Sequence, residues 1–210
     1  MDVDEQPFGD IEHALKRAAA ALNQADIPFL LGGSLASWAR GGPETRHDLD
    51  LMIKPADVER ALEALSEAGM RPERPPEPWL VKAWDGDTLV DLIYCPRGLP
   101  MDDDVFARGE ELSVLGMEIR VMALEDVMAT KLMALTEHSL RYESLLQIAR
   151  ALREQIDWPA VRSRTESSPF ARAFFTLLEG LESFPGAPPH RSGTTVRVVT
   201  PPGSHATQGG

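Results

Sequence analysis

The spacing of apolar residues predicts which segments of the chain are helices and which are strands. Apolar positions recur at helical spacing in some segments, as the buried face of a helix requires. Short apolar or alternating runs bounded by glycine, proline and polar residues are typical of strands. These patterns predict helices over 9–24, 34–40, 55–68, 124–136, 139–155, 158–164 and 169–181. They predict strands over 27–31, 49–53, 79–84, 88–94, 111–115 and 117–121, of which the last four form two hairpins.

The order of these elements divides the chain into two folded parts and a tail. Strands and helices mix over residues 1–122, whereas residues 123–184 are helical. We therefore expect an α+β protein in which a small mixed sheet flanked by helices precedes a C-terminal helical bundle. Residues 185–210 are rich in proline, glycine, serine and threonine, and are expected to form a flexible tail.

Two irregular segments are expected within the first part. Four prolines over 71–78 predict a loop, because proline removes a backbone donor and restricts its neighbours. The acidic run Asp102–Asp104 is expected to lie in a solvated loop.

Composition narrows the class of protein. Hydrophobic residues make up 43% of the chain, which predicts a folded protein, and no apolar run is long enough to predict a membrane span. The acidic start is unlike a secretory signal. Because Cys95 is the only cysteine, no internal disulfide can form, and a cytoplasmic location is expected.

The charge distribution bears on possible partners. A net charge of −12 argues against loose electrostatic adhesion to nucleic acid or to anionic membranes. It leaves open a specific RNA substrate that meets a local basic surface. The basic residues from Lys131 to Arg172 make the helical part the place for such a surface, although solvated helix faces are the commoner role of such residues.

The candidate chemistry begins with residues 29–53. A predicted strand runs into Gly32-Gly33-Ser34 at the start of a short helix, where bare backbone N–H groups suit a phosphate. Asp48 and Asp50 open the next strand and point to the same side, because strand side chains alternate. Two such carboxylates repel each other, and a divalent cation is their usual compensation.

A third acid completes the candidate site. Asp91 lies in the otherwise apolar strand 88–94, where an acid is costly unless it is paired or binds a metal. Three carboxylates on neighbouring strands would hold one or two Mg²⁺ ions, whose remaining ligands would be waters and substrate phosphates. A phosphate site beside such a metal site predicts that the substrate is a nucleoside triphosphate (NTP).

These residues resemble a known pattern. Gly32-Gly33-Ser34, Asp48-Leu49-Asp50 and an isolated strand acid at Asp91 are together similar to the nucleotidyltransferase superfamily related to DNA polymerase beta. The resemblance implies an N-terminal nucleotidyltransferase fold. It also implies a phosphate site at Gly33 and Ser34, and metal ligands at Asp48, Asp50 and Asp91.

A second resemblance lies in the first helix of the bundle. Val121 to Leu135, with Leu124-Glu-Asp126 and Lys131-Leu132, is similar to a helix of the AbiEii/MenT-type toxins of bacterial toxin–antitoxin systems. In those toxins the helix lysine contacts the nucleotide phosphates, which implies this role for Lys131. The pattern departs in the next helix, where Glu143 stands near the place of an aspartate in the toxins.

The sequence thus predicts a metal-dependent nucleotidyltransferase that releases pyrophosphate, with Asp48, Asp50, Asp91 and Lys131 as catalytic residues. The resemblance implies that the acceptor is a tRNA 3′ end and that the protein is a toxin restrained by a cognate antitoxin protein. Three alternatives stay open: an aminoglycoside or lincosamide nucleotidyltransferase, a protein adenylyltransferase antitoxin, and a catalytically silent nucleotide-binding module.

Overall fold

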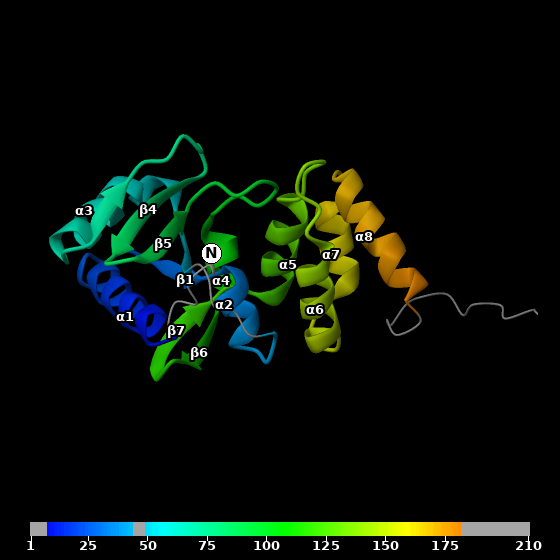
Figure 1. Cartoon of the computed structure of the whole chain (residues 1–210), viewed down its shortest axis with the longest axis horizontal. Helices are drawn as coiled ribbons and strands as arrows, with labels where there is room; N and C mark the ends of the chain where they lie inside the picture. Colours follow the sequence, from blue (N-terminus) through cyan, green and yellow to red (C-terminus); the bar gives the residue numbers. More distant parts are fainter. Residues whose placement is uncertain (1–7, 44–48, 182–210) are drawn as a thin grey trace, which may run out of the picture.

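The computed structural model describes residues 8–43 and 49–181 (Figure 1). The helices of these residues are α1 (Phe8–Gln24), α2 (Gly33–Trp38), α3 (Val58–Glu67), α4 (Asp103–Arg108), α5 (Leu124–Met133), α6 (Tyr142–Leu152), α7 (Trp158–Thr165) and α8 (Pro169–Gly180). A 3₁₀ turn, η1 (Pro55–Asp57), precedes α3. The strands are β1 (Phe29–Leu31), β2 (Leu49–Ile53), β3 (Arg71–Glu73), β4 (Leu80–Asp85), β5 (Thr88–Ile93), β6 (Glu110–Val114) and β7 (Met117–Val121).

The strands form one mixed sheet in the order β3-β4-β5-β2-β1-β7-β6. β1 pairs antiparallel with β2 and parallel with β7, while β2 and β5 are parallel. Helices α1 and α3 pack together and against β4 and β5, where alternate residues of β5 such as Val90 and Leu92 are fully buried. The predicted α+β class and the helix-flanked mixed sheet are confirmed.

Both predicted hairpins are present, and their turns have the backbone that short hairpin loops need. Gly86 has φ +60° between β4 and β5, and Leu115 and Gly116 have φ +52° and +74° between β6 and β7. Left-handed residues in a tight loop match the twist of the two strands they join. The turn at Gly86 sets the β4–β5 register, in which Asp85 faces Thr88.

The prediction that 71–78 is entirely a loop was wrong, because Arg71–Glu73 forms strand β3. This strand lies at the edge of the sheet and pairs only with β4, with Pro72 opposite Ala83. An edge strand tolerates proline because one of its sides has no strand to which it must donate.

The acidic run at 102–104 was also assigned wrongly to a loop. Asp102 caps helix α4, its side chain accepting a hydrogen bond of 3.1 Å from the Val105 backbone N–H, and Asp103 and Asp104 lie in the first turn. Carboxylates are favourable at a helix N-terminus because they satisfy backbone donors and face the positive end of the helix dipole.

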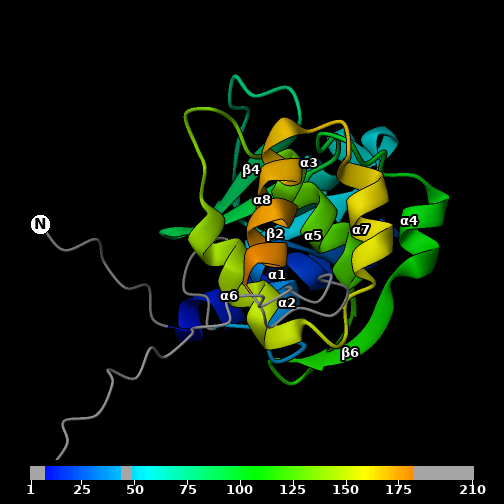
Figure 2. The ribbon, with the colours of Figure 1, turned by 90° about the vertical axis from the view of Figure 1, so that its right-hand side faces the viewer.

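Two groups of buried apolar residues lie along the chain. The first is built from the sheet and its flanking helices, and the second from α5 to α8. Figure 2 shows α6, α7 and α8 side by side at the helical end, with α5 behind them. Helix α5 adjoins both groups, with Val127 in the first and Met128 in the second. The division into domains at 1–122 and 123–184 stays a prediction.

Two further predictions concern the chain as a whole. The expected tail, 185–210, lies outside the described residues. In the part of the chain that the structure covers, no helix combines the length and apolar character needed to cross a bilayer.

Candidate active site

The corner between β1 and α2 forms one wall of the site. The Gly32 N–H donates a 2.9 Å hydrogen bond to the Asp50 carbonyl oxygen, which fastens the corner to β2. On the other side of β1, the Met122 N–H donates to the Leu31 carbonyl oxygen at 2.9 Å. The corner therefore lies at the point where the chain leaves β1, with strands on both sides to hold it.

Gly33 lies directly against the Asp50 carboxylate. Its φ is +58°, a left-handed conformation that side chains disfavour. A Cβ at this position would lie 1.7 Å from Asp50 Oδ2. A glycine is therefore required here for two reasons, the backbone conformation and the close approach of the acid.

Asp50 and Asp91 are neighbours across two parallel strands. The register of β2 and β5 places their Cα atoms opposite each other, and parallel partners point their side chains to the same face. Both residues are half-buried, while Leu51 and Leu92, the next residues on each strand, are fully buried on the opposite face. The sequence predicted this pair from the strand patterns, and the sheet brings its members together.

A lysine stands on the other side of Asp91. Lys82 is its direct partner in the antiparallel pairing of β4 with β5, and the Lys82 Nζ lies 3.7 Å from Asp91 Oδ1. The sheet therefore carries a row of charges across three adjacent strands, with Lys82, Asp91 and Asp50 in that order. Lys82 was not among the residues predicted from the sequence, although the hairpin register counted back from the turn at Gly86 places it opposite Asp91.

Lys131 reaches the glycine corner from α5. Its Nζ lies 3.0 Å from Ser34 Oγ, at the first turn of α2, and both residues are half-buried. Helix α2 packs against α5, which brings together residues that are far apart in the sequence. An ammonium and a hydroxyl side by side, next to bare backbone, match the donors that bind phosphate groups.

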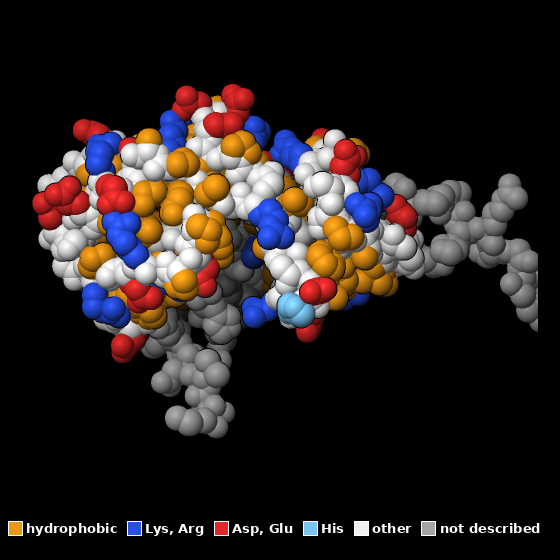
Figure 3. All heavy atoms as spheres, turned by 90° about the horizontal axis from the view of Figure 1, so that it is seen from above, with side chains coloured by type: hydrophobic (Ala, Val, Ile, Leu, Met, Phe, Trp, Pro, Cys, Tyr) orange, Lys and Arg blue, Asp and Glu red, His pale blue; other side chains and the backbone are white. Residues whose placement is uncertain are grey.

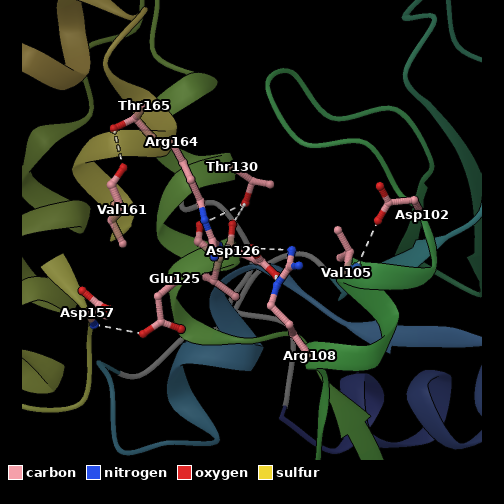
Figure 4. Close-up of polar contacts among 11 residues, drawn as sticks. Asp102, Val105, Arg108, Glu125, Asp126, Thr130, Asp157, Val161, Arg164 and Thr165 are labelled. Carbon is pink, nitrogen blue, oxygen red and sulfur yellow. Dashed lines mark hydrogen bonds and ion pairs between the residues drawn. The ribbon is translucent and has the colours of Figure 1, made fainter. Parts of the chain in front are cut away.

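A buried carboxylate holds α5 in this position (Figure 4). Asp126 is fully buried and accepts hydrogen bonds from Arg108 Nε at 3.0 Å and Nη2 at 3.1 Å. It also accepts one from Arg164 Nη1 at 2.5 Å. The hydrogen bond to Asp126 raises the pKa of Arg108 above its ordinary value. The two arginines come from α4 and α7 and Asp126 from α5, so one acid joins the sheet side of the molecule to the helical bundle.

The remaining candidate residues lie apart from this cluster or outside the structure. Asp48 falls outside the described residues. Among the residues that are described, no group of three or more acidic, histidine or cysteine side chains could hold a metal ion. Glu143 lies exposed in the first turn of α6. Figure 3 shows the surface hollowed where the α/β part meets the helical part, with lysine or arginine side chains beside the hollow.

The sequence of the chain matches a known family over most of its length. A family model described as "Uncharacterised nucleotidyltransferase" matches residues 10–184. The chain belongs to this family. The match covers both the α/β part and the helical part, and it confirms the predicted enzyme class. No curated protein sequence matches the chain.

Solved structures share the fold. The solution structure of the antibiotic-resistance factor ANT(2″)-Ia has a TM-score of 0.55 and 17% identity, covering 81% of this chain and 96% of that one. The crystal structure of ANT(2″)-Ia in complex with adenylyl-2″-tobramycin has a TM-score of 0.53 and 16% identity, covering 80% and 98%. These likenesses confirm the nucleotidyltransferase fold. They do not bear on the toxin branch, which stays a prediction.

Proposed function

We propose that this protein transfers a nucleoside monophosphate from an NTP to a hydroxyl group of an acceptor and releases pyrophosphate. The observation that carries the proposal is the adjacency of Asp50 and Asp91 on β2 and β5, with Gly33 against the Asp50 carboxylate. A phosphate-binding corner directly beside paired acids is the arrangement that metal-dependent nucleotidyl transfer needs.

The nucleotide side of the site is formed by Gly33, Ser34 and Lys131. Lys131 Nζ and Ser34 Oγ, already 3.0 Å apart, would donate hydrogen bonds to phosphate oxygens. Gly33 would let a phosphate approach the backbone closely, because it carries no side chain. We therefore assign these three residues to binding of the triphosphate.

The acids suit one or two Mg²⁺ ions. Mg²⁺ prefers oxygen ligands, and the two adjacent, half-buried carboxylates of Asp50 and Asp91 supply them. Asp48, two positions before Asp50 in the sequence, is the predicted third ligand. When bound, the ions supply positive charge that offsets the triphosphate and polarise the phosphorus that is attacked.

Asp91 is the candidate general base. The acceptor oxygen would form a bond to the α-phosphorus as its proton passes to the Asp91 carboxylate. The bond from the α-phosphorus to the bridging oxygen would break, and pyrophosphate would leave with the electron pair. Lys131 and Ser34 would stabilise the charge that develops on the departing group.

For the acceptor, we infer a tRNA 3′ end, with the protein acting as a toxin restrained by an antitoxin. The support is the similarity of the helix that carries Lys131 to the corresponding toxin helix. One observation weakens the idea that the helical part is a broad basic surface, because several of its arginines already have partners. Arg162 pairs with Glu179, Arg153 with Glu154 and Arg164 with Asp126.

A second acceptor class is favoured by the structural comparison. ANT(2″)-Ia, which shares the fold, is an antibiotic-resistance factor solved in complex with adenylyl-2″-tobramycin. A small aminoglycoside-like compound would need no extended basic surface, and the net charge of −12 suits a cationic substrate.

The decisive test is transfer of label from each α-³²P-labelled NTP to total bacterial tRNA and to tobramycin in the presence of Mg²⁺. We expect wild-type protein to label one acceptor and release pyrophosphate. Asp50→Asn and Asp91→Asn should each lower the rate at least ~100-fold, because each removes a charged ligand without changing the shape of the side chain. Sequencing of tRNA 3′ ends from cells expressing wild type or Asp50→Asn would test the tRNA acceptor directly. Full activity in Asp91→Asn would refute the role of this acid.

A further inference from the structure

Lys82 forms an ion pair with Asp91, the candidate general base. It faces the same side of the sheet as Asp91, and its Nζ lies 3.7 Å from Asp91 Oδ1. The Lys82 side chain is 23% exposed and that of Asp91 is 14% exposed, so the pair is largely shielded from solvent. Charges that are shielded in this way interact more strongly than those of a surface ion pair.

The order of the strands separates this lysine from the nucleotide-binding residues. Across the sheet the sequence is β4, β5, β2 and β1, so Lys82 lies beyond Asp91, while the corner of Gly33 and Ser34 lies beyond Asp50. Lys131 contacts Ser34 at that far end. The two lysines therefore stand at opposite ends of the carboxylate pair, and only Lys131 is next to the residues assigned to the triphosphate.

We propose that Lys82 is a positioning residue that holds the Asp91 carboxylate in place for the acceptor hydroxyl. This inference rests on the proposed function, because it assigns the use of Asp91 as a base. Asp50 and Asp91 carry like charges on adjacent strands and repel each other. The Lys82 ammonium attracts Asp91 from the opposite side, which opposes this repulsion and limits rotation of the carboxylate.

The backbone fixes the base of the Lys82 side chain. Its neighbours on β4, Val81 and Ala83, are buried on the opposite face of the sheet, and both strands beside β4 pair with it. Lys82 therefore extends its ammonium from a rigid strand and not from a loop. A rigidly held counter-ion can set the position of its partner to within the narrow limits that proton transfer requires.

The test compares Lys82→Met, which removes the ammonium, with Lys82→Arg, which keeps the charge. The matched control is Lys16→Met, which removes a lysine from an exposed ion pair with Glu12 on α1. Pyrophosphate release is measured with Mg²⁺, NTP and each of the two acceptors, tRNA and tobramycin. We expect Lys82→Met to lower kcat about 10- to 100-fold with KM for the NTP within about twofold of wild type. Lys82→Arg should recover much of the loss, and Lys16→Met should match wild type.

A second measurement needs no activity. Urea unfolding of Lys82→Met, Asp91→Asn and the double variant forms a double-mutant cycle. We expect the midpoint shift of the double variant to be smaller than the two single shifts together, because either change alone leaves a shielded charge without its counter-ion. Additive shifts would mean that the pair does not interact, and would overturn the inference.

The outcomes separate the inference from the function on which it rests. If wild type transfers label and Lys82→Met does so at the same rate, the positioning role fails while the function stands. A rise in KM for the NTP with kcat unchanged would make Lys82 a nucleotide-binding residue, which also overturns the inference. If wild type transfers nothing, the proposed function fails, and coupling in the unfolding cycle would then identify the pair as structural only.

Discussion

The contact between Gly33 and Asp50 allows a sharp prediction for the substitution Gly33→Ala. A Cβ at Gly33 would lie 1.7 Å from Asp50 Oδ2, whereas ordinary contacts of a Cβ lie at 3.4–4 Å. The carboxylate or the corner must therefore move by at least about 1.7 Å, the difference between these distances. A misplacement of about 1 Å can cost a reaction about 100-fold in rate, so we expect kcat to fall at least that far.

The same substitution has a calculable effect on stability. A left-handed alanine costs about 1–2 kcal/mol, and an Asp50 side chain forced from its rotamer costs about 1 kcal/mol more. The free energy of unfolding should therefore fall by about 2–3 kcal/mol. With a urea m-value of about 2 kcal/mol/M, the unfolding midpoint should fall by roughly 1–1.5 M, which leaves the protein folded at low denaturant.

Gly86→Ala provides the matched control. Gly86 has φ +60°, almost the same as the +58° of Gly33, but a Cβ there meets nothing within 4 Å. Gly86→Ala should lower the free energy of unfolding by about 1–2 kcal/mol through backbone strain, and the variant should keep its activity within about twofold of wild type. Urea unfolding and pyrophosphate release are measured on both variants. Backbone strain affects both of them, whereas the steric clash with Asp50 affects Gly33→Ala, so the comparison separates the two effects. If folded Gly33→Ala keeps more than about a tenth of wild-type kcat, or if Gly86→Ala loses as much, the reasoning is refuted.

Three further predictions follow from the site and from the acid that holds α5. Lys131→Met should raise KM for the NTP about tenfold or more, because the ammonium beside Ser34 Oγ would no longer meet the phosphates; unchanged nucleotide binding by calorimetry would contradict its assignment. Asp126→Asn should lower the free energy of unfolding by about 3 kcal/mol, since the carboxylate is buried and both arginines keep about a third of their side chains exposed to water. The control Glu125→Gln, on the same helix, should cost less than about 1 kcal/mol because its contact with the Asp157 N–H is exposed, and equal losses in urea unfolding would count against the special role of Asp126. Removing divalent cations with EDTA should abolish pyrophosphate release, and added Mg²⁺ should restore it; activity that persists in EDTA would exclude the metal-dependent reaction.

The parts of the fold that depend on local patterns were predictable from the sequence. Strand β2 begins and ends where the apolar run predicted, and both hairpin turns occur at their glycines. The side chains of Asp50 and Asp91 share a face, as alternation along each strand required. These features follow from residues within a few positions of each other, which the sequence displays directly.

Features that depend on partners distant in the chain could not be predicted in the same way. Strand β3 forms because Arg71–Glu73 can pair with the edge of β4. The prolines of 71–78 gave no indication of this pairing. The burial of Asp126 depends on arginines from α4 and α7 that converge on it. The only local indication of this burial was the position of Asp126 in a largely apolar helix.

The sequence by itself predicted which residues carry the chemistry and determined on which elements most of them lie, because strand alternation, turn glycines and helical spacing act over short distances. Only the tertiary structure decided that Lys131 meets Ser34, that Lys82 faces Asp91 and that the Asp50 carboxylate lies against Gly33. The physical reason is that strand order, register and helix docking are set by the packing of the whole core, in which segments far apart in the chain become neighbours.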